Sequence, residues 1–435
     1  MIIENITFRY HRNNALSWLE NVASAFRNTL CPHCYPLRFS IVDFQEDRFT
    51  IEATVLNYNK IHKYAGALEK VEIYHPRRKQ LQSQPFTVVQ IIPTGVRCEF
   101  GGYAGDATPV TNLLAAAAEF VVTHPNAVNA SELNEMAENI LYVEGKSLDD
   151  FLLGHLALLP VICNRIGTFV DPTGKDYLDS VINTLNAARA VKGIECDRYV
   201  VLNRELGVRI AWSETGCAVG TIVDAEAILE AVEALQKQGM DAIGGVSVIH
   251  GVTEEMFTKY LHDEIPNPSG GVEAIITHLI SKVFRLPTAH APLPYYQAIK
   301  GRHTENPRAA AEFISIPHYY CVLKGLARAP RLLPLSSLEP LPGPSLTVNN
   351  VGAIVVPASC MGGIPALVAE FSDIPLITVR ENTTVLNLTN QKMNMHNVIE
   401  VATYLEACGV VLALRNGISL DSLRRPLGGV QQISL

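Results

Sequence analysis

The chain has 435 residues, of which 48% are hydrophobic and 18% are charged, and its 35 basic and 43 acidic side chains give a formal net charge of -8. This composition excludes disorder as the main state, and the length suggests two or three domains. Because the chain is mildly acidic and carries no basic stripe, we expect no nucleic-acid partner.

The nine cysteines are odd in number, scattered and mostly set in apolar runs, which is typical of a reducing compartment. The N-terminus lacks the basic start and apolar core of a signal peptide, and no window approaches the ~18 uninterrupted apolar residues of a membrane span. We therefore expect a cytoplasmic protein without a membrane partner.

Residues 1–85 are predicted to form a small α+β N-terminal domain. A helical stretch near Ala15–Leu30 precedes two alternating, strand-like runs, Leu37–Phe44 and Phe49–Leu56. The charged and glutamine-rich stretch 75–85 then marks a domain boundary.

The motif Cys31-Pro-His-Cys34 has the C-x-x-C spacing of thiol oxidoreductases. Those enzymes place the motif after a strand and at the start of a helix, whereas here it follows a predicted helix and precedes a strand. We expect a turn with two reduced thiols, remote from the main cleft.

From Phe86 onward, short unbroken apolar runs alternate with alanine- and leucine-rich helical stretches. Runs such as FTVVQIIP (86–93) and GAIVVP (352–357) are typical of strands buried on both faces of a parallel sheet. We predict that residues 86–435 form an α/β body with one doubly wound, mostly parallel sheet, and that both runs are among its buried strands.

Residues 327–347 contain five prolines, which block a helix and a central strand alike. The stretch is predicted to be a linker or an extended surface crossing. It divides the body into two lobes, 86–326 and 348–435, or else the second segment is only the far half of the same sheet.

In an open parallel sheet, ligands bind outside the carboxyl ends of the strands. After the run at 86–93 comes a loop that leads to a helix start and contains Gly101, Gly102, Gly105 and Asp106. Glycines let backbone amides approach a ligand, and a helix N-terminus favours an anion. The spacing is not that of a dinucleotide fingerprint, and a plain glycine-rich turn is the alternative.

Two further strand ends carry polar side chains. His124, Asn126 and Asn129 can donate and accept hydrogen bonds toward a ligand, although the asparagines could simply cap the turn. Glu144 and Lys146 follow the next apolar run. They are not needed for capping and suit a general base or a carboxylate clamp, with a solvated pair as the alternative.

The run GAIVVP leads through Ser359, Cys360, Gly362 and Gly363 straight into a helix. This arrangement suits an anion, and a helix N-terminus would favour the thiolate of Cys360. Cys360 is thus a candidate nucleophile, with a buried filler as the alternative.

The next strand end carries Arg380, Glu381 and Asn382, and an arginine there could fork onto a carboxylate or phosphate. His250, His290 and Cys217 are too far apart in sequence to propose a metal site from spacing. The sequence therefore predicts no metal and identifies no cofactor.

The phrases GGYAGDATPV, THPNAVNASEL, YVEGKSLDDFL and PASCMGGIPALVAEF together resemble a mainly cyanobacterial family catalogued only as a domain of unknown function. The resemblance runs over most of the chain from about residue 86. It implies a cytoplasmic protein of a photosynthetic prokaryote, but no activity or catalytic residue can be carried over.

We expect an enzyme that acts on a small anionic metabolite, a carboxylate or a phosphate. In this interpretation the Gly101–Asp106 and Ser359–Gly363 loops hold the anion and meet His124–Asn129 at one pocket. We expect Arg97 and Arg380 to neutralise the charge of the anion. We expect His124, Glu144 or Glu381 to transfer the proton. The alternative is a non-catalytic ligand sensor or a homo-oligomeric assembly protein that uses its N-terminal domain. A perturbed acid or base at the pocket would favour the enzyme.

Overall fold

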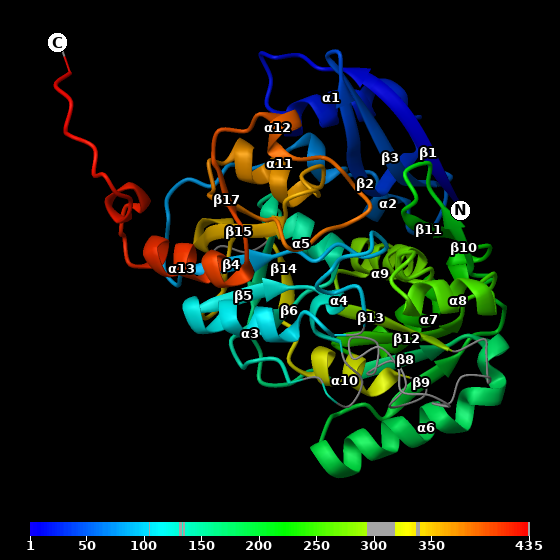
Figure 1. Ribbon diagram of the computed structural model, residues 1–435. Coiled ribbons are helices and arrows are strands. Elements are labelled where there is room, and N and C mark those ends of the chain that lie inside the picture. The colour runs from blue at the N-terminus through cyan, green and yellow to red at the C-terminus, as the bar shows by residue number, and fades with distance from the viewer. Residues whose placement is uncertain (104, 130–132, 134, 294–317, 336–339, 434–435) are drawn as a thin grey trace.

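The computed structural model describes residues 1–433 except 104, 130–132, 134, 294–317 and 336–339 (Figure 1). Its described elements form an antiparallel N-terminal sheet and two parallel sheets, each of the latter flanked by helices. The predicted α/β class with a small α+β N-terminal domain is confirmed. None of the described helices combines the length and the apolar character needed to cross a membrane.

The N-terminal domain is a three-stranded sheet in the order β1-β3-β2 with helix α1 on one face. The helix starts at a capping box, in which Ser17 and Glu20 bond each other's backbone N–H groups, and it buries a stripe that includes Trp18 and Phe26. The first strand was not predicted, because most of its side chains are exposed and its apolar signal is weak. The elements are β1 (Ile2–His11), α1 (Trp18–Thr29), β2 (Cys34–Gln45), β3 (Arg48–Asn57), α2 (Ala65–Leu68) and η1 (Glu72–Tyr74).

The larger body sheet has six parallel strands in the order β17-β16-β15-β4-β5-β6. The two predicted runs form β4 and β15, which are buried and adjacent at the centre. Alternate residues face opposite helix layers: Val88 packs with α3 and α13, and Val89 packs with α5 and α11. The strands are β4 (Thr87–Gln90), β5 (Phe120–Thr123), β6 (Ile140–Tyr142), β15 (Val351–Pro357), β16 (Leu376–Val379) and β17 (Val398–Val401). The helices are α3 (Thr108–Ala117), α4 (Pro125–Val128), α5 (Gly145–Leu152), α11 (Ile364–Phe371), α12 (Asn390–Met393) and α13 (Tyr404–Arg415).

The expectation of one sheet was wrong, because a second parallel sheet of four strands stands in the order β13-β12-β8-β9. Its strands are β8 (Ile166–Val170), β9 (Arg198–Val201), β12 (Ala242–Val248) and β13 (Thr288–Leu293). Helices α7 and α9 cover one face, and α6 and α10 cover the other. The helices are α6 (Leu178–Ala187), α7 (Ala225–Lys237), α8 (Glu254–Leu261), α9 (Gly270–Phe284) and α10 (Tyr319–Ala327), and a hairpin pairs β10 (Arg209–Trp212) with β11 (Ala218–Thr221).

The segment 348–435 supplies the far half of the six-stranded sheet, which is one of the two arrangements considered from the sequence. Part of the proline-rich stretch is itself a strand, since β14 (Arg331–Pro334) pairs antiparallel with β7 (Leu156–Leu159). Proline is tolerated there because this two-stranded sheet consists only of edges.

Cys31 and Cys34 form a disulfide in the turn between α1 and β2. The expectation of two reduced thiols is therefore not met. Neither cysteine lines the main cavity, in agreement with their predicted distance from it.

Candidate functional site

A cavity of about 350 Å³ lies where the carboxyl ends of β4, β5, β6 and β15 meet helix α9, strand β13 and strand β2. A volume of this size suits a small ligand. Helices α5, α9 and α11 begin at its wall, so their positive dipole ends face the space. The cavity is thus built from both parallel sheets and from the N-terminal domain.

The three predicted loops do meet here, since each contributes at least one residue to the wall. Seven of the candidate residues line the cavity: Gly102, His124, Asn126, Asn129, Glu144, Cys360 and Gly363. The geometry follows from parallel strands pointing their carboxyl ends the same way.

His124 is held as a neutral hydrogen-bonding group. Its Nε2 accepts the backbone N–H of Ile92 at 2.9 Å, which assigns the ring proton to Nδ1. Burial lowers the pKa of His124 to about 4. The imidazole is therefore a donor at neutral pH and not a charged acid.

Glu144 and His278 form a carboxylate–histidine pair, with Oε1 of Glu144 against Nδ1 of His278. Glu144 also caps helix α5 by accepting the N–H of Ser147 at 3.1 Å, so the expectation that it was not needed for capping was wrong. Burial alone would raise the pKa of Glu144, but the charge and hydrogen bond of His278 lower it to about 2. The pair orients the ring and leaves Nε2 without a hydrogen-bond partner among the described residues.

The close approach of His278 depends on Gly145, because an added Cβ there would lie 2.9 Å from the ring carbon Cε1. His278 belongs to helix α9, more than a hundred residues from Glu144, and no local motif surrounds it. Sequence reasoning therefore missed it.

Asp149 is a second functional candidate that sequence reasoning missed. It lines the cavity, and burial raises its pKa to about 8, with the charges of Asp150 and Glu144 adding to the shift and that of Lys146 opposing it. A carboxyl group with this pKa is mostly protonated at neutral pH and can give up a proton.

Arg38 reaches the cavity from strand β2. Its Nη1 makes only long hydrogen bonds, 3.5 Å to the carbonyl of Ala218 and 3.4 Å to that of Gly271. Among the described residues, no carboxylate lies within 4.0 Å of it, and burial lowers its pKa. It was missed because the N-terminal domain was treated as separate from the cleft.

A second carboxylate–histidine pair lies on the same wall. Nδ1 of His290 lies 3.2 Å from Oε2 of Glu273, and its Nε2 lies 2.8 Å from the hydroxyl of Ser247. Both ring nitrogens are engaged, so His290 positions Glu273, whereas His278 keeps one nitrogen available.

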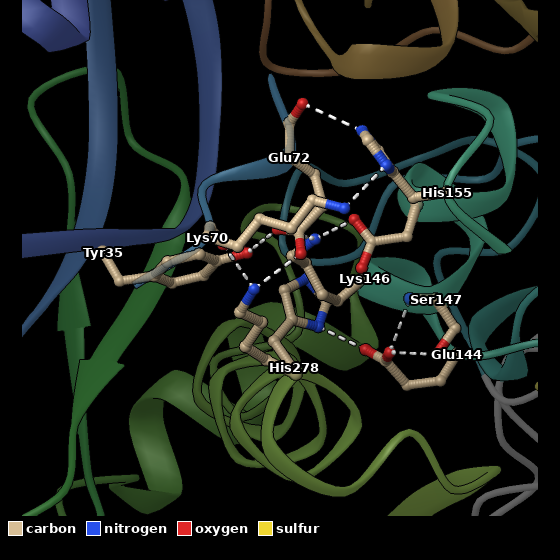
Figure 2. A network of polar contacts seen from close by, with 10 residues as sticks. Tyr35, Lys70, Glu72, Glu144, Lys146, Ser147, His155 and His278 are labelled. Carbon is tan, nitrogen blue, oxygen red and sulfur yellow. Dashed lines mark hydrogen bonds and ion pairs between the residues drawn. The ribbon is translucent and has the colours of Figure 1, made fainter. Parts of the chain in front are cut away.

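Lys146 does not line the cavity, and its ammonium belongs to a buried ion network (Figure 2). Its ammonium pairs with Asp150 and lies 3.6 Å from Glu72, while Lys282 bonds the other oxygen of Glu72 at 2.6 Å. Tyr35 also donates to Glu72 at 2.8 Å. The predicted ligand-binding role of Lys146 is therefore replaced by a role in joining α5 to the N-terminal domain.

The glycine-rich loop, residues 101–106, is stabilised by a hydrogen bond within the loop. Asp106 accepts the N–H of Gly101 at 2.6 Å, and Gly101 and Gly105 have φ of 88° and 69°, which residues other than glycine rarely adopt. Arg97 donates to the carbonyl of Asp263 at 2.9 Å and does not line the cavity. Apart from Gly102, the alternative of a glycine-rich turn fits this loop.

Cys360 lines the cavity, but it does not fit a nucleophile. Burial raises the pKa of its thiol to about 11, and its neighbours are the hydroxyls of Ser359 and Thr384, not a base. The Ser359 hydroxyl is itself 2.8 Å from that of Thr384. Gly362 faces strand β2, where an added Cβ would lie 1.9 Å from the carbonyl oxygen of Ile41.

The strand end at 380–382 has structural roles. Arg380 is exposed and lies 3.8 Å from Glu400. Glu381 accepts the N–H of Tyr404 at 2.6 Å, and Asn382 bonds both backbone groups of Phe100. None of the three lines the cavity, so the predicted roles in anion and proton handling are not supported by their positions.

Comparison with known proteins identifies relatives but no reaction. A family model described as a protein of unknown function (DUF3326) matches residues 87–424, which confirms the resemblance seen in the sequence. A Synechococcus protein named as an uncharacterized lipoprotein is 34% identical over 339 residues, covering 78% of this chain and 93% of that protein. No solved structure matches.

Proposed function

This chain belongs to the DUF3326 family of proteins of unknown function, and from the chemistry of its cavity we propose that it is an enzyme acting on a small anionic metabolite. The single observation that carries the proposal is the pairing of Glu144 with His278 in a cavity that is also lined by Asp149, whose pKa is raised. Acid–base catalysis requires a proton acceptor and a proton donor in the same cavity, and His278 and Asp149 suit these two roles.

In the proposed mechanism, Nε2 of His278 removes a proton from the bound metabolite. Glu144 holds the ring in place through Nδ1 and stabilises the imidazolium that forms. Asp149 donates a proton to the site where negative charge develops, and the neutral His124 donates a hydrogen bond. The helix N-termini at the wall favour the anionic form of the substrate.

The test is to incubate the purified protein with a metabolite extract and follow depletion of anionic compounds by mass spectrometry. We expect the wild type to convert one such compound, and His278→Gln and Asp149→Asn to slow the conversion by about 10²–10⁴-fold. His396→Gln and Asp179→Asn are matched controls at exposed positions and should leave it unchanged. Enrichment of a compound without conversion would instead support the ligand sensor.

We also propose a cytoplasmic location. It is supported by the seven free cysteines, six of which are buried as thiols, against the one disulfide Cys31–Cys34, since secreted proteins usually pair most of their cysteines. Fractionation of native cells tests this: recovery of the protein with membranes or outside the cytoplasm would overturn it.

A further inference from the structure

The side chain of Arg38 is a partly buried cation with no carboxylate within 4.0 Å among the described residues. In the same part of the chain, its hydrogen bonds are the long ones from Nη1 to the carbonyls of Ala218 and Gly271. The charge of Glu52 acts on Arg38 from beyond 4.0 Å, and the Glu52 carboxylate accepts the N–H of Thr215 at 2.9 Å and its hydroxyl at 2.7 Å. A charge that is partly withdrawn from water is stabilised by a close opposite charge, so the cavity favours an anion beside this guanidinium.

The start of helix α9 lies next to the guanidinium, since Gly271 is in its first turn. Its two leading glycines permit this placement: an added Cβ would lie 2.4 Å from Oγ1 of Thr94 at Gly270 and 2.0 Å from the carbonyl oxygen of Ala218 at Gly271. A cation and the positive end of a 15-residue helix thus act on the same part of the cavity.

The charge of the surroundings favours a carboxylate over a phosphate. Glu144 and Glu273 are also on the cavity wall, and each is paired with a histidine. One guanidinium balances the single charge of one carboxylate group, whereas one phosphate group would concentrate nearly two charges beside these acids. The planar fork of arginine matches the oxygens of either group, so the charge of the surroundings, and not the shape of the guanidinium, favours the carboxylate.

The N-terminal domain that carries Arg38 is held against helix α9 by buried polar contacts. Tyr35, on the same strand, donates to Glu72, which bonds Lys282 of helix α9 (Figure 2). The family model begins at residue 87, so the acid–base residues lie in the matched part and Arg38 lies outside it. The domain therefore adds a group that the family's shared part does not contain.

We propose that Arg38 is the carboxylate-binding residue of the cavity and that the N-terminal domain in this way selects carboxylate substrates. This deepens the proposed function, because it names the substrate class.

The experiment measures binding of succinate by calorimetry at constant ionic strength, with its uncharged diamide and inorganic phosphate as comparison ligands. We expect succinate to bind the wild type at millimolar concentration, Arg38→Gln to weaken binding at least about tenfold, and Arg38→Lys to weaken it less. Arg9→Gln, at an exposed position of β1, is the matched control and should bind like the wild type.

A second measurement needs no variant: succinate should protect Arg38 of the wild type from phenylglyoxal, as read from the modified peptide by mass spectrometry. The proposal is overturned if succinate does not bind or does not protect Arg38, if Arg38→Gln binds it unchanged, or if phosphate binds more tightly at Arg38. Failure of the proposed enzyme reaction is a separate result, because a protein that binds succinate through Arg38 without converting any metabolite would be a carboxylate sensor.

Discussion

Helix α5 contributes to two charged clusters that differ in how completely they are paired. Lys146 and Asp150 belong to the ion network with Glu72, in which the charges balance and contact one another. Glu144 and Asp149 of the same segment line the cavity, where Arg38 has no carboxylate within 4.0 Å among the described residues and the pKa of Asp149 is raised. The difference teaches that complete pairing marks a structural cluster and incomplete pairing marks a candidate binding site.

The largest effect is expected from breaking the paired cluster. Glu72→Gln removes the charge that compensates two buried lysines, so we expect the free energy of unfolding to fall by about 3–5 kcal/mol. Urea denaturation measures this, and Glu69→Gln, exposed on the same segment, should change stability by less than about 0.5 kcal/mol. Equal effects of the two substitutions would contradict the role of the network.

A smaller loss is expected where the N-terminal domain meets the cavity loop. Gly362→Val would push against the Ile41 carbonyl, and we expect the unfolding free energy to fall by about 1–3 kcal/mol. Gly363→Ala is the matched control, because an added Cβ there has its nearest atom at 3.6 Å. If Gly362→Val kept full stability but lost succinate binding, Gly362 would belong to the ligand site after all.

The unpaired cluster should show itself in the pH dependence of stability. The pKa of Asp149 is about 8 in the folded protein and 3.8 by ordinary reference, so between these values the folded state holds a proton that the unfolded state has lost. The contribution of Asp149 to the free energy of unfolding therefore falls as the pH rises from about 4 toward 8. We expect Asp149→Asn to gain on the wild type by up to about 1.4 kcal/mol for each pH unit within that range, because the substitution removes the titration.

Asp179→Asn, exposed on α6, is the control for this measurement and should follow the wild-type curve. Thermal denaturation at a series of pH values gives both curves. A wild-type curve that rises with pH by as much as the Asp149→Asn curve would show that Asp149 is already ionised in the folded protein.

The smallest effect is expected at a residue outside both clusters. Arg380 is 62% exposed and only 3.8 Å from Glu400, so Arg380→Gln should alter stability by less than about 0.5 kcal/mol and leave succinate binding unchanged. A clear loss of succinate binding would restore the role that the sequence suggested for it.

The sequence was sufficient for much of the architecture. Unbroken apolar runs identified β4 and β15 as buried strands, and the polar strand ends indicated that loops distant in sequence would meet at one cavity. These features depend on local periodicity and on the common direction of parallel strands, both of which are readable along the chain. The number of sheets could not be predicted from the sequence. Strands of both sheets have the same apolar pattern, and this pattern does not tell which strands pair with one another.

The chemistry of the site was decided by the tertiary structure. His278 meets Glu144 although the two are 134 positions apart in the sequence, and Arg38 enters from a domain that sequence reasoning had set apart. Lys146 and Asp149 are three positions apart on one helix but differ in their surroundings. Lys146 pairs with Glu72, whereas Asp149 lines the cavity and has a raised pKa. A side chain's charge state depends on its burial and on neighbours within a few ångströms, and folding alone brings those neighbours together.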